Sequence, residues 1–390
     1  MSKGRIVVGG ILFTFPIGGV LWQHLHYLLG LRQLGYDVTY IEVNEYYPND
    51  YEGEEGGFPD VERVVRRVAS LLERFGFADC WHYGVKWEEQ TWGLPPEAAD
   101  ERLRTADAYL NLCGSQILDE RHLSCPRRIL LETDPVEVQA ALGRQDQETI
   151  DFLGSHTHLF TFGENIGTPF CPLSTGGFAW KPTRQIVCME EWETDMLPAP
   201  DAPYTTIGNW DVVGKEITLD GRVYHWQKGL EFLKVKELPQ RVSAPFELAM
   251  RFGAEADKAL MERHGWRTRS AIGVSLDLDV YRSYIQGSRG EYTVAKEQNI
   301  VFQTGWFSDR AAAYLAAGRP VINQDTGFAH NLPTGSGLFS FRDLDDSIAA
   351  VQAIEANYAA ACRAAREIAR EYFNYDRVLS KLLSEAGLEG

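Results

Sequence analysis

The sequence predicts an α/β protein made of two parallel β-sheets that face one another across a cleft. The chain has 390 residues, 44% of them hydrophobic and 24% charged, which suits about two globular domains. An apolar run, Arg5–Phe13, is followed by a helical pattern and a second apolar run, Asp37–Val43. This order is that of a βαβ unit with parallel strands. The same alternation of strand and helix patterns resumes near Tyr204.

The first half is predicted to begin with a strand, a loop at Thr14–Gly19 and a helix over about Val20–Leu34. Gly35 stands where a helix C-cap belongs. An acidic loop, Glu45–Pro59, then leads to a further helix and to three strands, expected at Asp60–Phe75, Ala108–Cys113, Arg128–Glu132 and Leu159–Phe162. Each of these strands ends in polar or glycine-containing residues, and such loops at the carboxyl ends of parallel strands bind ligands.

Prolines and glycines gather in Cys171–Pro203, which predicts an irregular linker between two domains. We expect the domains to span residues 1–185 and 186–372, followed by a last helical segment over 373–390. The pattern beyond the linker predicts strands near Tyr204–Ile207, Phe246–Met250, Ala271–Val274, Glu291–Val294 and Pro320–Asn323. It predicts helices over Lys228–Val235, Ala254–His264, Leu278–Ile285, Ser308–Ala317, Leu344–Tyr372 and Tyr375–Leu388.

The net charge of −17 argues against a nucleic-acid polymer as partner, because binding phosphate backbones needs concentrated Lys and Arg. A single nucleotide remains compatible, since a few backbone amides and cations hold a diphosphate locally. Six cysteines without a CxxC pair predict reduced thiols rather than a disulfide frame or a zinc site. The N-terminal run lacks a small-x-small cleavage site, and no apolar stretch approaches the ~20 residues of a membrane helix. We therefore expect a cytoplasmic protein with no transmembrane segment.

One motif with chemical meaning is Ser308-Asp309-Arg310, at the start of an alanine-rich helix that ends at Gly318. Free N–H groups at the beginning of this helix and the charge of Arg310 make an anion site that suits a diphosphate. The alternative is that Ser308 simply caps the helix and Asp309 complements its dipole.

The second motif, Asp325-Thr326-Gly327, follows the next predicted strand. A carboxylate beside flexible backbone amides is suited to hold sugar hydroxyls. The alternative is an Asx turn closed by Gly327. An anion site and a polyol site one βα unit apart together describe a sugar diphosphate.

The segment Ala316-Ala317-Gly318-Arg319-Pro320-Val321 resembles the "small-small-Gly-x-Pro-Val" sequence of the GT-B glycosyltransferases, whose two Rossmann-like domains face a cleft. Ser288-Arg289-Gly290-Glu291-Tyr292 is similar to the family's Ser-x-x-Glu-(Phe/Tyr) segment, whose glutamate contacts the donor sugar. The loop Phe15–Gly19 resembles the glycine-rich loop that approaches the donor phosphate. The resemblance is to nucleotide-sugar-dependent enzymes such as families one and four. It implies that Glu291 contacts the donor sugar and that Gly18 and Gly19 lie near the donor phosphate. It also implies that the C-terminal helix, 373–390, returns to the N-terminal domain.

The family usually has a ribose-binding glutamate five residues before the terminal glycine, where this chain has Ala313. Asp309, one turn earlier, or another loop would have to take that role. Related enzymes use an Arg/Lys pair near the start of the second domain to neutralise the leaving diphosphate, and Lys215 and Lys228 lie there. Solvated lysines are the alternative. Because side chains and a helix dipole stabilise the leaving group in this fold, the resemblance implies no metal and no cofactor beyond the nucleotide-sugar co-substrate.

An inverting transferase needs a base for the proton of the acceptor hydroxyl, and His24 and His26 both lie near the Gly18-Gly19 loop. We favour His24, which is nearer to the loop and lies off the apolar face of the helix. Asp134, at the end of its strand, is expected to orient it; a half-exposed helix histidine without catalytic role is the alternative. The Glu291 segment leans towards the retaining relatives, so the stereochemistry stays open.

Acceptor-binding candidates are Trp22, which is suited to stack on a ring, and Glu164 and Asn165, which alternatively cap a turn. The sequence predicts a glycosyltransferase that moves a sugar from a nucleotide-diphosphate donor to a hydroxyl or other nucleophile of a small-molecule or glycan acceptor. A homodimer is compatible with this prediction. The alternatives are a sugar-nucleotide-binding protein without transferase activity, and an epimerase or phosphorylase of the same fold. A nicotinamide oxidoreductase is disfavoured, because the loop after the first strand, Gly9–Phe13, does not match GxGxxG.

Overall fold

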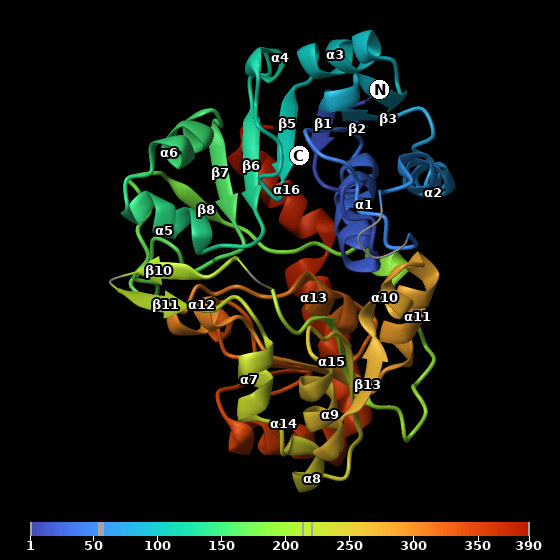
Figure 1. The fold of residues 1–390 in the computed structure, drawn as a ribbon, viewed down its shortest axis with the longest axis vertical. Coiled ribbons are helices and arrows are strands. Elements are labelled where there is room, and N and C mark those ends of the chain that lie inside the picture. Colours follow the sequence, from blue (N-terminus) through green and yellow to red (C-terminus); the bar gives the residue numbers. More distant parts are fainter. Residues whose placement is uncertain (1, 54–57, 213, 220, 389–390) are drawn as a thin grey trace.

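The computed structural model of the chain describes residues 2–53, 58–212, 214–219 and 221–388, so residues 54–57 of the expected loop Glu45–Pro59 lie outside the described residues. The described chain forms two main β-sheets, one above the other in Figure 1. The strands of both sheets point towards the level between them, as the arrows of β6 (Arg128–Glu132) and β13 (Arg267–Ser270) show (Figure 1). The loops at their carboxyl ends therefore meet.

The first sheet has eight strands in the order β4-β3-β2-β1-β5-β6-β7-β8, all parallel to their neighbours except β4, which is antiparallel to β3. Besides β6, its strands are β1 (Arg5–Gly9), β2 (Asp37–Asn44), β3 (Trp81–Val85), β4 (Gln90–Gly93), β5 (Ala108–Leu112), β7 (His158–Thr161) and β8 (Trp180–Pro182). Its helices are α1 (Gly18–Gln33), α2 (Val61–Arg74), α3 (Pro96–Arg104), α4 (Glu120–Leu123), α5 (Glu137–Gly143) and α6 (Gln147–Gly154). The predicted βαβ unit is confirmed, with Arg5 in register with Asp37.

The second sheet has six parallel strands in the order β13-β12-β9-β14-β15-β16. Besides β13, these are β9 (Tyr204–Asn209), β12 (Phe246–Arg251), β14 (Gly290–Thr293), β15 (Val321–Gln324) and β16 (Leu338–Phe341). A separate hairpin consists of β10 (Ile217–Leu219) and β11 (Arg222–Tyr224). The helices of this half are α7 (Gly229–Lys234), α8 (Leu238–Arg241), α9 (Glu255–Arg263), α10 (Ala271–Ser275), α11 (Leu278–Gly287), α12 (Glu297–Val301), α13 (Asp309–Ala316), α14 (Leu344–Ala356) and α15 (Tyr358–Ile368).

The chain ends with α16 (Tyr375–Glu385), which lies beside α1 of the first half (Figure 1). The backbone N–H of Tyr375 donates to the carbonyl of Val187 (3.1 Å), and the Arg127 guanidinium donates to the carbonyl of Gly387 (2.8 Å). The predicted return of the C-terminal helix is therefore confirmed. The boundaries at residues 185 and 372 remain predictions.

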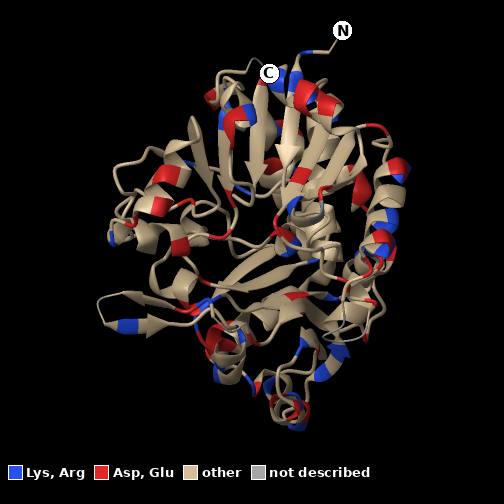
Figure 2. Ribbon diagram, turned by 45° about the horizontal axis from the view of Figure 1, so that its top comes forward, with Lys and Arg blue, Asp and Glu red and all other residues tan. Residues whose placement is uncertain are grey.

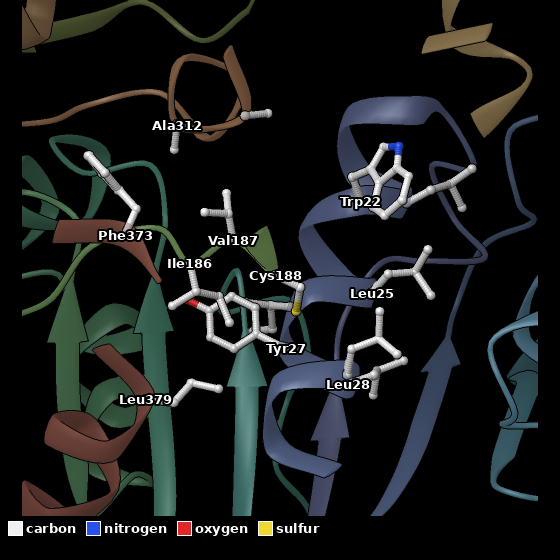
Figure 3. Close-up of a cluster of buried hydrophobic side chains, with 14 of the residues drawn as sticks. Trp22, Leu25, Tyr27, Leu28, Ile186, Val187, Cys188, Ala312, Phe373 and Leu379 are labelled. Carbon is white, nitrogen blue, oxygen red and sulfur yellow. The ribbon is translucent and has the colours of Figure 1, made fainter. Parts of the chain in front are cut away.

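One buried apolar cluster connects the two halves through α1. Figure 3 shows Trp22, Leu25 and Leu28 of α1 together with Ile186–Cys188 and with Leu379 of α16. The same cluster includes buried residues of α11 and α13, which belong to the second half. Since such a shared core resists separation, α1 holds the first sheet and the helices around the second sheet in a fixed relation.

Two predicted elements differ from the structure. The segment expected as a strand at Ala271–Val274 is helical, because Ser270 accepts a hydrogen bond from the N–H of Gly273 (3.2 Å) and starts α10. The strand of this unit lies one segment earlier, in the polar β13. The helix expected over Leu344–Tyr372 is broken at Asn357, which ends α14 and accepts from the N–H of Ala360 (3.3 Å) to begin α15.

Lys and Arg are interspersed with Asp and Glu on helices of both halves (Figure 2). The negative net charge is thus not confined to one element. Among the described residues, no helix combines the length and the apolar character that crossing a membrane requires.

Candidate functional site

A cavity of about 250 Å³ lies between the two halves. Its wall from the first half is the beginning of α1, including Gly19 and Gln23. Its wall from the second half includes the end of β9, α10 and the residues Ser308–Arg310. The cavity is therefore bordered by the carboxyl-end loops of both sheets, where parallel sheets bind ligands.

Two helices begin at this cavity without a side-chain cap. The N-cap residues Ile17 of α1 and Ser308 of α13 make no capping hydrogen bond with their side chains. The positive ends of both helix dipoles thus border the cavity, and in α13 the Asp309 carboxyl group itself accepts a hydrogen bond from the backbone of Asp309. The alternative that Ser308 serves as an ordinary helix cap does not fit this geometry.

Asp309 carries a carboxyl group into the cavity wall at the start of α13. It accepts a hydrogen bond from the amide of Gln23 in α1 (3.2 Å), so it also links the two halves. Burial raises the pKa of Asp309 to about 7. Ala313, where the family has its ribose-binding glutamate, lines the same cavity one turn further along α13. Asp309 is the carboxyl group in the cavity wall.

The Arg310 guanidinium is held by a buried carboxylate. Its Nε donates to Glu291 Oε1 (2.6 Å), and its Nη2 donates to the hydroxyl of Thr293 (3.1 Å). Glu291 lies on β14, is fully buried and does not line the cavity. Its position fits a residue that fixes Arg310 better than one that contacts a sugar directly.

Three lysines extend this group of cations. Lys296, three residues after the end of β14, donates to both carboxylate oxygens of Asp134 (2.7 and 2.5 Å) and lies 3.2 Å from the ring centroid of Trp226. Lys215 lies 4.8 Å from the same ring. Burial, and next the charge of Arg310, lower the pKa of Lys228 to about 7.

Lys228 differs from Arg310 and Lys296 in having no acidic partner among the described residues. Arg310 and Lys296 each form an ion pair, whereas no carboxylate among the described residues lies within ion-pair distance of Lys228. A cation that burial and neighbouring cations disfavour gains most from an arriving anion. The predicted donor residues Lys228 and Arg310 are therefore brought together by the structure.

Lys296 did not appear among the sequence candidates. It follows the carboxyl end of a predicted strand, which is the same rule that singled out Asp134. Applied to every strand, that rule finds it.

His24 does not have the surroundings expected of a base. Its Nε2 accepts a hydrogen bond from the N–H of Ile11 (3.0 Å) and its Nδ1 donates to the carbonyl of Val20 (2.8 Å). The side chain is fully buried, and burial lowers its pKa to about 4. Asp134 does not orient it but pairs with Lys296 instead. His24 thus fixes the loop after β1, which corrects the expected catalytic arrangement.

We expect His24→Ala to lower the free energy of unfolding by about 1–3 kcal/mol, because the buried N–H of Ile11 loses its acceptor. Urea denaturation measures this loss, and His24→Gln, whose amide oxygen offers an acceptor, should lose less. A fall in turnover with unchanged stability would instead support the base.

The predicted glycine loop has a packing role. A Cβ on Gly18 would lie 2.5 Å from the ring of Tyr281 in α11, so only glycine allows α1 and α11 to approach this closely. Gly19 lines the cavity, as does Trp22. The Trp22 indole N–H donates to the carbonyl of Leu278 (3.3 Å), and the ring is buried. Trp22 therefore belongs to the cavity wall and to the junction of the halves.

The structure separates the other acceptor candidates from this cavity. The amide of Asn165 donates to the carbonyls of Gln303 (2.9 Å) and Gly327 (3.1 Å), so this buried side chain joins the two halves. Glu164 pairs with Arg184 (2.6 Å) at a different cavity, beside α16. Neither residue is placed to bind an acceptor in the cavity between the halves.

The motif Asp325-Thr326-Gly327 forms the Asx turn that was the alternative to a sugar site. Asp325 accepts a hydrogen bond from the N–H of Gly327 (2.9 Å), and the hydroxyl of Thr326 donates to the carbonyl of Trp306. Gly327 has a φ of 84°, and a Cβ there would lie 2.6 Å from the Asn165 amide nitrogen. This turn therefore packs against the first half and does not border the cavity.

In the part of the chain that the structure describes, no group of three or more His, Cys, Asp or Glu side chains is placed to hold a metal ion. The six cysteines are free thiols. Metal-independent chemistry and the lack of a cofactor remain predictions.

Two facing parallel sheets with a returning C-terminal helix define the GT-B class of fold, and solved glycosyltransferases share it. An alpha-glucosyltransferase in complex with UDP-glucose and DNA containing an abasic site has a TM-score of 0.61 and 9% identity, over 98% of this chain and 99% of that chain. AviGT4, a glycosyltransferase involved in avilamycin A biosynthesis, has a TM-score of 0.56 and 10% identity, over 98% and 97%. HepE from Anabaena, in complex with UDP and glucose, has a TM-score of 0.55 and 9% identity, over 98% and 99%.

No protein-family model and no curated protein matches the sequence. The structural likeness confirms the predicted resemblance to GT-B glycosyltransferases and the predicted fold class. At 9–10% identity it establishes the fold.

The predicted exclusion of nucleic acid is wrong. The alpha-glucosyltransferase with this fold is seen with DNA that contains an abasic site or an A:G mismatch. Net charge describes the whole chain, whereas a binding surface depends on the local arrangement of cations. A net charge of −17 therefore does not rule out a nucleic-acid partner.

Proposed function

We propose that this protein is a glycosyltransferase that uses a nucleoside-diphosphate sugar as its donor. The observation that carries the proposal is the surplus of positive charge around Lys228, beside Arg310 and Lys296, next to the uncapped beginning of α13. Transfer breaks the bond between the anomeric carbon and the diphosphate oxygen, and the electron pair leaves with the diphosphate. Preorganised cations and helix N–H groups stabilise the charge that develops there.

The cavity supports a nucleotide as the rest of the ligand. It combines apolar walls from Ile17, Ala271 and Ile272 with polar groups of Asn209 and Ser308. Such a mixture of apolar walls and a few polar groups is typical of small-molecule sites. UDP or UDP-glucose is present in related structures of the alpha-glucosyltransferase and of HepE. We propose that the nucleoside lies against α10 and the diphosphate against α13.

The acceptor is then expected at the loops of the first sheet, which face the donor across the cavity. We propose a hydroxyl-bearing acceptor, either a small molecule, a glycan or DNA. The cytoplasmic location and the homodimer stay predictions from the sequence.

A donor panel tests the proposal. Thermal shift and calorimetry with UDP, GDP, ADP and CDP should identify one base that binds, and its sugar nucleotides are then offered with each acceptor class. We expect nucleotide release that depends on the acceptor. Binding without any release would favour a sugar-nucleotide-binding protein, and failure of every nucleoside diphosphate to bind would refute the proposal.

Lys228→Met should weaken binding of the nucleoside diphosphate by about 10- to 100-fold, because it removes a charge-assisted hydrogen bond to phosphate. Calorimetry measures the change. The free energy of unfolding of Lys228→Met should not fall, since the variant no longer buries a cation that has no carboxylate partner among the described residues. The matched control is Lys258→Met on α9, which removes an exposed pair with Glu255 and should leave the affinity unchanged. Equal affinities of both variants would contradict the assigned phosphate site.

A further inference from the structure

We propose that Asp134 occupies, in the donor-free protein, the place on Lys296 that a donor phosphate takes. Donor binding would replace the Asp134 carboxylate on the Lys296 ammonium with the phosphate and free Asp134 to face the acceptor. This inference rests on the proposed function and extends it to one residue from each half.

The geometry of the pair allows such an exchange. Lys296 and Asp134 follow β14 of the second sheet and β6 of the first sheet, so their contact joins carboxyl-end loops of the two halves. Neither side chain lines the cavity itself. The Asp134 side chain is 37% exposed, whereas that of Lys296 is 12% exposed. The carboxylate therefore has access to solvent in which to move, while the ammonium stays against the Trp226 ring.

Each partner is held in place by bonds other than the ion pair. The N–H of Ala295, next to Lys296, donates to the side chain of Gln324 (3.1 Å). On the other side, the carbonyl of Thr133, next to Asp134, accepts from the indole of Trp306 (2.9 Å). Loss of the ion pair thus leaves the backbone next to Lys296 and next to Asp134 in place.

The ion pair is also not needed to hold the halves together. Asn165 bonds two carbonyls of the second half, and Arg74 of α2 forms a bidentate pair with Asp279 of α11 (2.7 and 2.8 Å). Because the Asp134 side chain is 37% exposed, solvent screens the pair, and its net contribution to stability is small.

The loop that carries Asp134 is strained. Val136, two residues later, has a φ of 102°, which is rare for a β-branched residue. Its N–H donates to the side chain of Gln139 (2.7 Å), which holds the loop in this form. Cys113, at the end of the adjacent β5, also has a positive φ, 64°. Such strain is typical of functional loops that the surrounding structure holds in place.

The charges around the pair favour the exchange. With Asp134 in place, the cations Arg310, Lys215, Lys228 and Lys296 lie near the carboxylates of Glu291, Glu137 and Asp134. When Asp134 leaves, four cations face two carboxylates, and two positive charges are unbalanced. This surplus matches a diphosphate in which each phosphate carries a negative charge.

The freed carboxylate then has a chemical task. As the acceptor oxygen bonds to the anomeric carbon, its proton passes to a carboxylate oxygen of Asp134, and the bond to the diphosphate oxygen breaks with its electron pair. Lys296 and Lys228 hold the departing diphosphate. Because both nitrogens of His24 are engaged with the backbone, Asp134 is the better placed proton acceptor.

Calorimetry with inorganic pyrophosphate tests the exchange without knowledge of the donor's nucleobase or sugar. Lys296→Met should bind pyrophosphate at least 10-fold more weakly than the parent. Asp134→Asn should bind it about 3- to 10-fold more tightly, because Lys296 no longer exchanges a carboxylate for the ligand. A purely structural ion pair would give weaker binding in both variants, and this outcome would overturn the inference.

Matched controls come from the second ion pair that joins the halves. Arg74→Met and Asp279→Asn should leave pyrophosphate binding unchanged. Asp134→Ser provides a second variant in case the asparagine variant does not fold. The exchange would be refuted, and the proposed function left intact, by the following result: the parent protein transfers sugar, but Asp134→Asn and Lys296→Met both bind pyrophosphate more weakly than the parent. Parent protein that binds no nucleoside diphosphate would refute the function itself.

Turnover separates the role of base from that of counter-ion. Asp134→Asn should lower kcat by about 100-fold or more while KM for the donor falls, as expected when a general base is lost but donor binding improves. Unchanged kcat in this variant would overturn the assignment of the base.

Discussion

Replacing Arg310 with methionine is expected to lower the free energy of unfolding by about 3–5 kcal/mol. The reason is Glu291, whose side chain is fully buried and pairs with Arg310 at 2.6 Å. The second carboxylate oxygen of Glu291 has no hydrogen-bond partner among the described residues. Without the guanidinium, the buried carboxylate has no compensating charge. The cost of its desolvation then destabilises the folded state.

Urea denaturation of four proteins tests this expectation. The double variant Arg310→Met with Glu291→Gln should recover most of the lost stability, because it removes the buried charge as well as its partner. The control Arg342→Met breaks an exposed pair with Asp346 and should cost less than about 1 kcal/mol. Equal losses in Arg310→Met and Arg342→Met would show that Glu291 is not held as a buried anion. The double variant should still fail to bind pyrophosphate, since stability and the anion site are separate properties of Arg310.

The elements that the sequence predicts well are those with a strong local pattern. The strand Arg128–Glu132 has the predicted bounds, and α13 differs by one residue at each end. Apolar periodicity and the residues that start or end a helix are properties of one element, so they can be read from one sequence. The helix-start motif likewise located Ser308 and Arg310 at the cavity, and the carboxyl-end rule located Asp134, which pairs with Lys296.

Partners that are distant in the chain could not be predicted in this way. Lys296 and Asp134 are 162 positions apart, and nothing near either residue specifies the other. Gly18 is glycine because of the Tyr281 ring, which is also a contact between the halves. The roles of these residues therefore depend on how the second half packs against the first half. No local sequence pattern contains that information.

His24 and Asp325 were wrongly assigned for a related reason. Each has a side chain suited to catalysis or sugar binding, but each accepts a hydrogen bond from a nearby backbone N–H group. His24 bonds the N–H of Ile11, and Asp325 bonds the N–H of Gly327. A polar side chain near a ligand site serves the ligand only if the backbone leaves its donors and acceptors free.

The dependence of stability on pH should change in opposite directions in two cavity variants, His26→Gln and Asp309→Asn. The indole N–H of Trp192 donates to Nε2 of His26 (2.8 Å), and burial lowers the pKa of His26 to about 3 from 6.5. Its neutral form stabilises the fold above pH 6.5, and this contribution is lost as the pH falls towards 3. Burial raises the pKa of Asp309 to about 7 from 3.8, so its protonated form stabilises the fold below pH 3.8. That contribution is lost as the pH rises through 7.

Between pH 4.5 and 6.5 both groups titrate differently in the folded and unfolded states, and each changes stability by about 1.4 kcal/mol per pH unit. Relative to the parent, His26→Gln should therefore gain about 3 kcal/mol when the pH falls from 6.5 to 4.5, and Asp309→Asn should lose about as much. Urea denaturation at several pH values measures both differences. Using differences from the parent removes the contribution of other titrating groups, and the double variant should follow the parent because its two changes cancel. If the Asp309→Asn difference did not vary with pH, the carboxyl group would be ionised in the folded protein throughout this range. Asp309 would then add a negative charge at the start of α13 and oppose the diphosphate, whereas a protonated Asp309 adds no charge there.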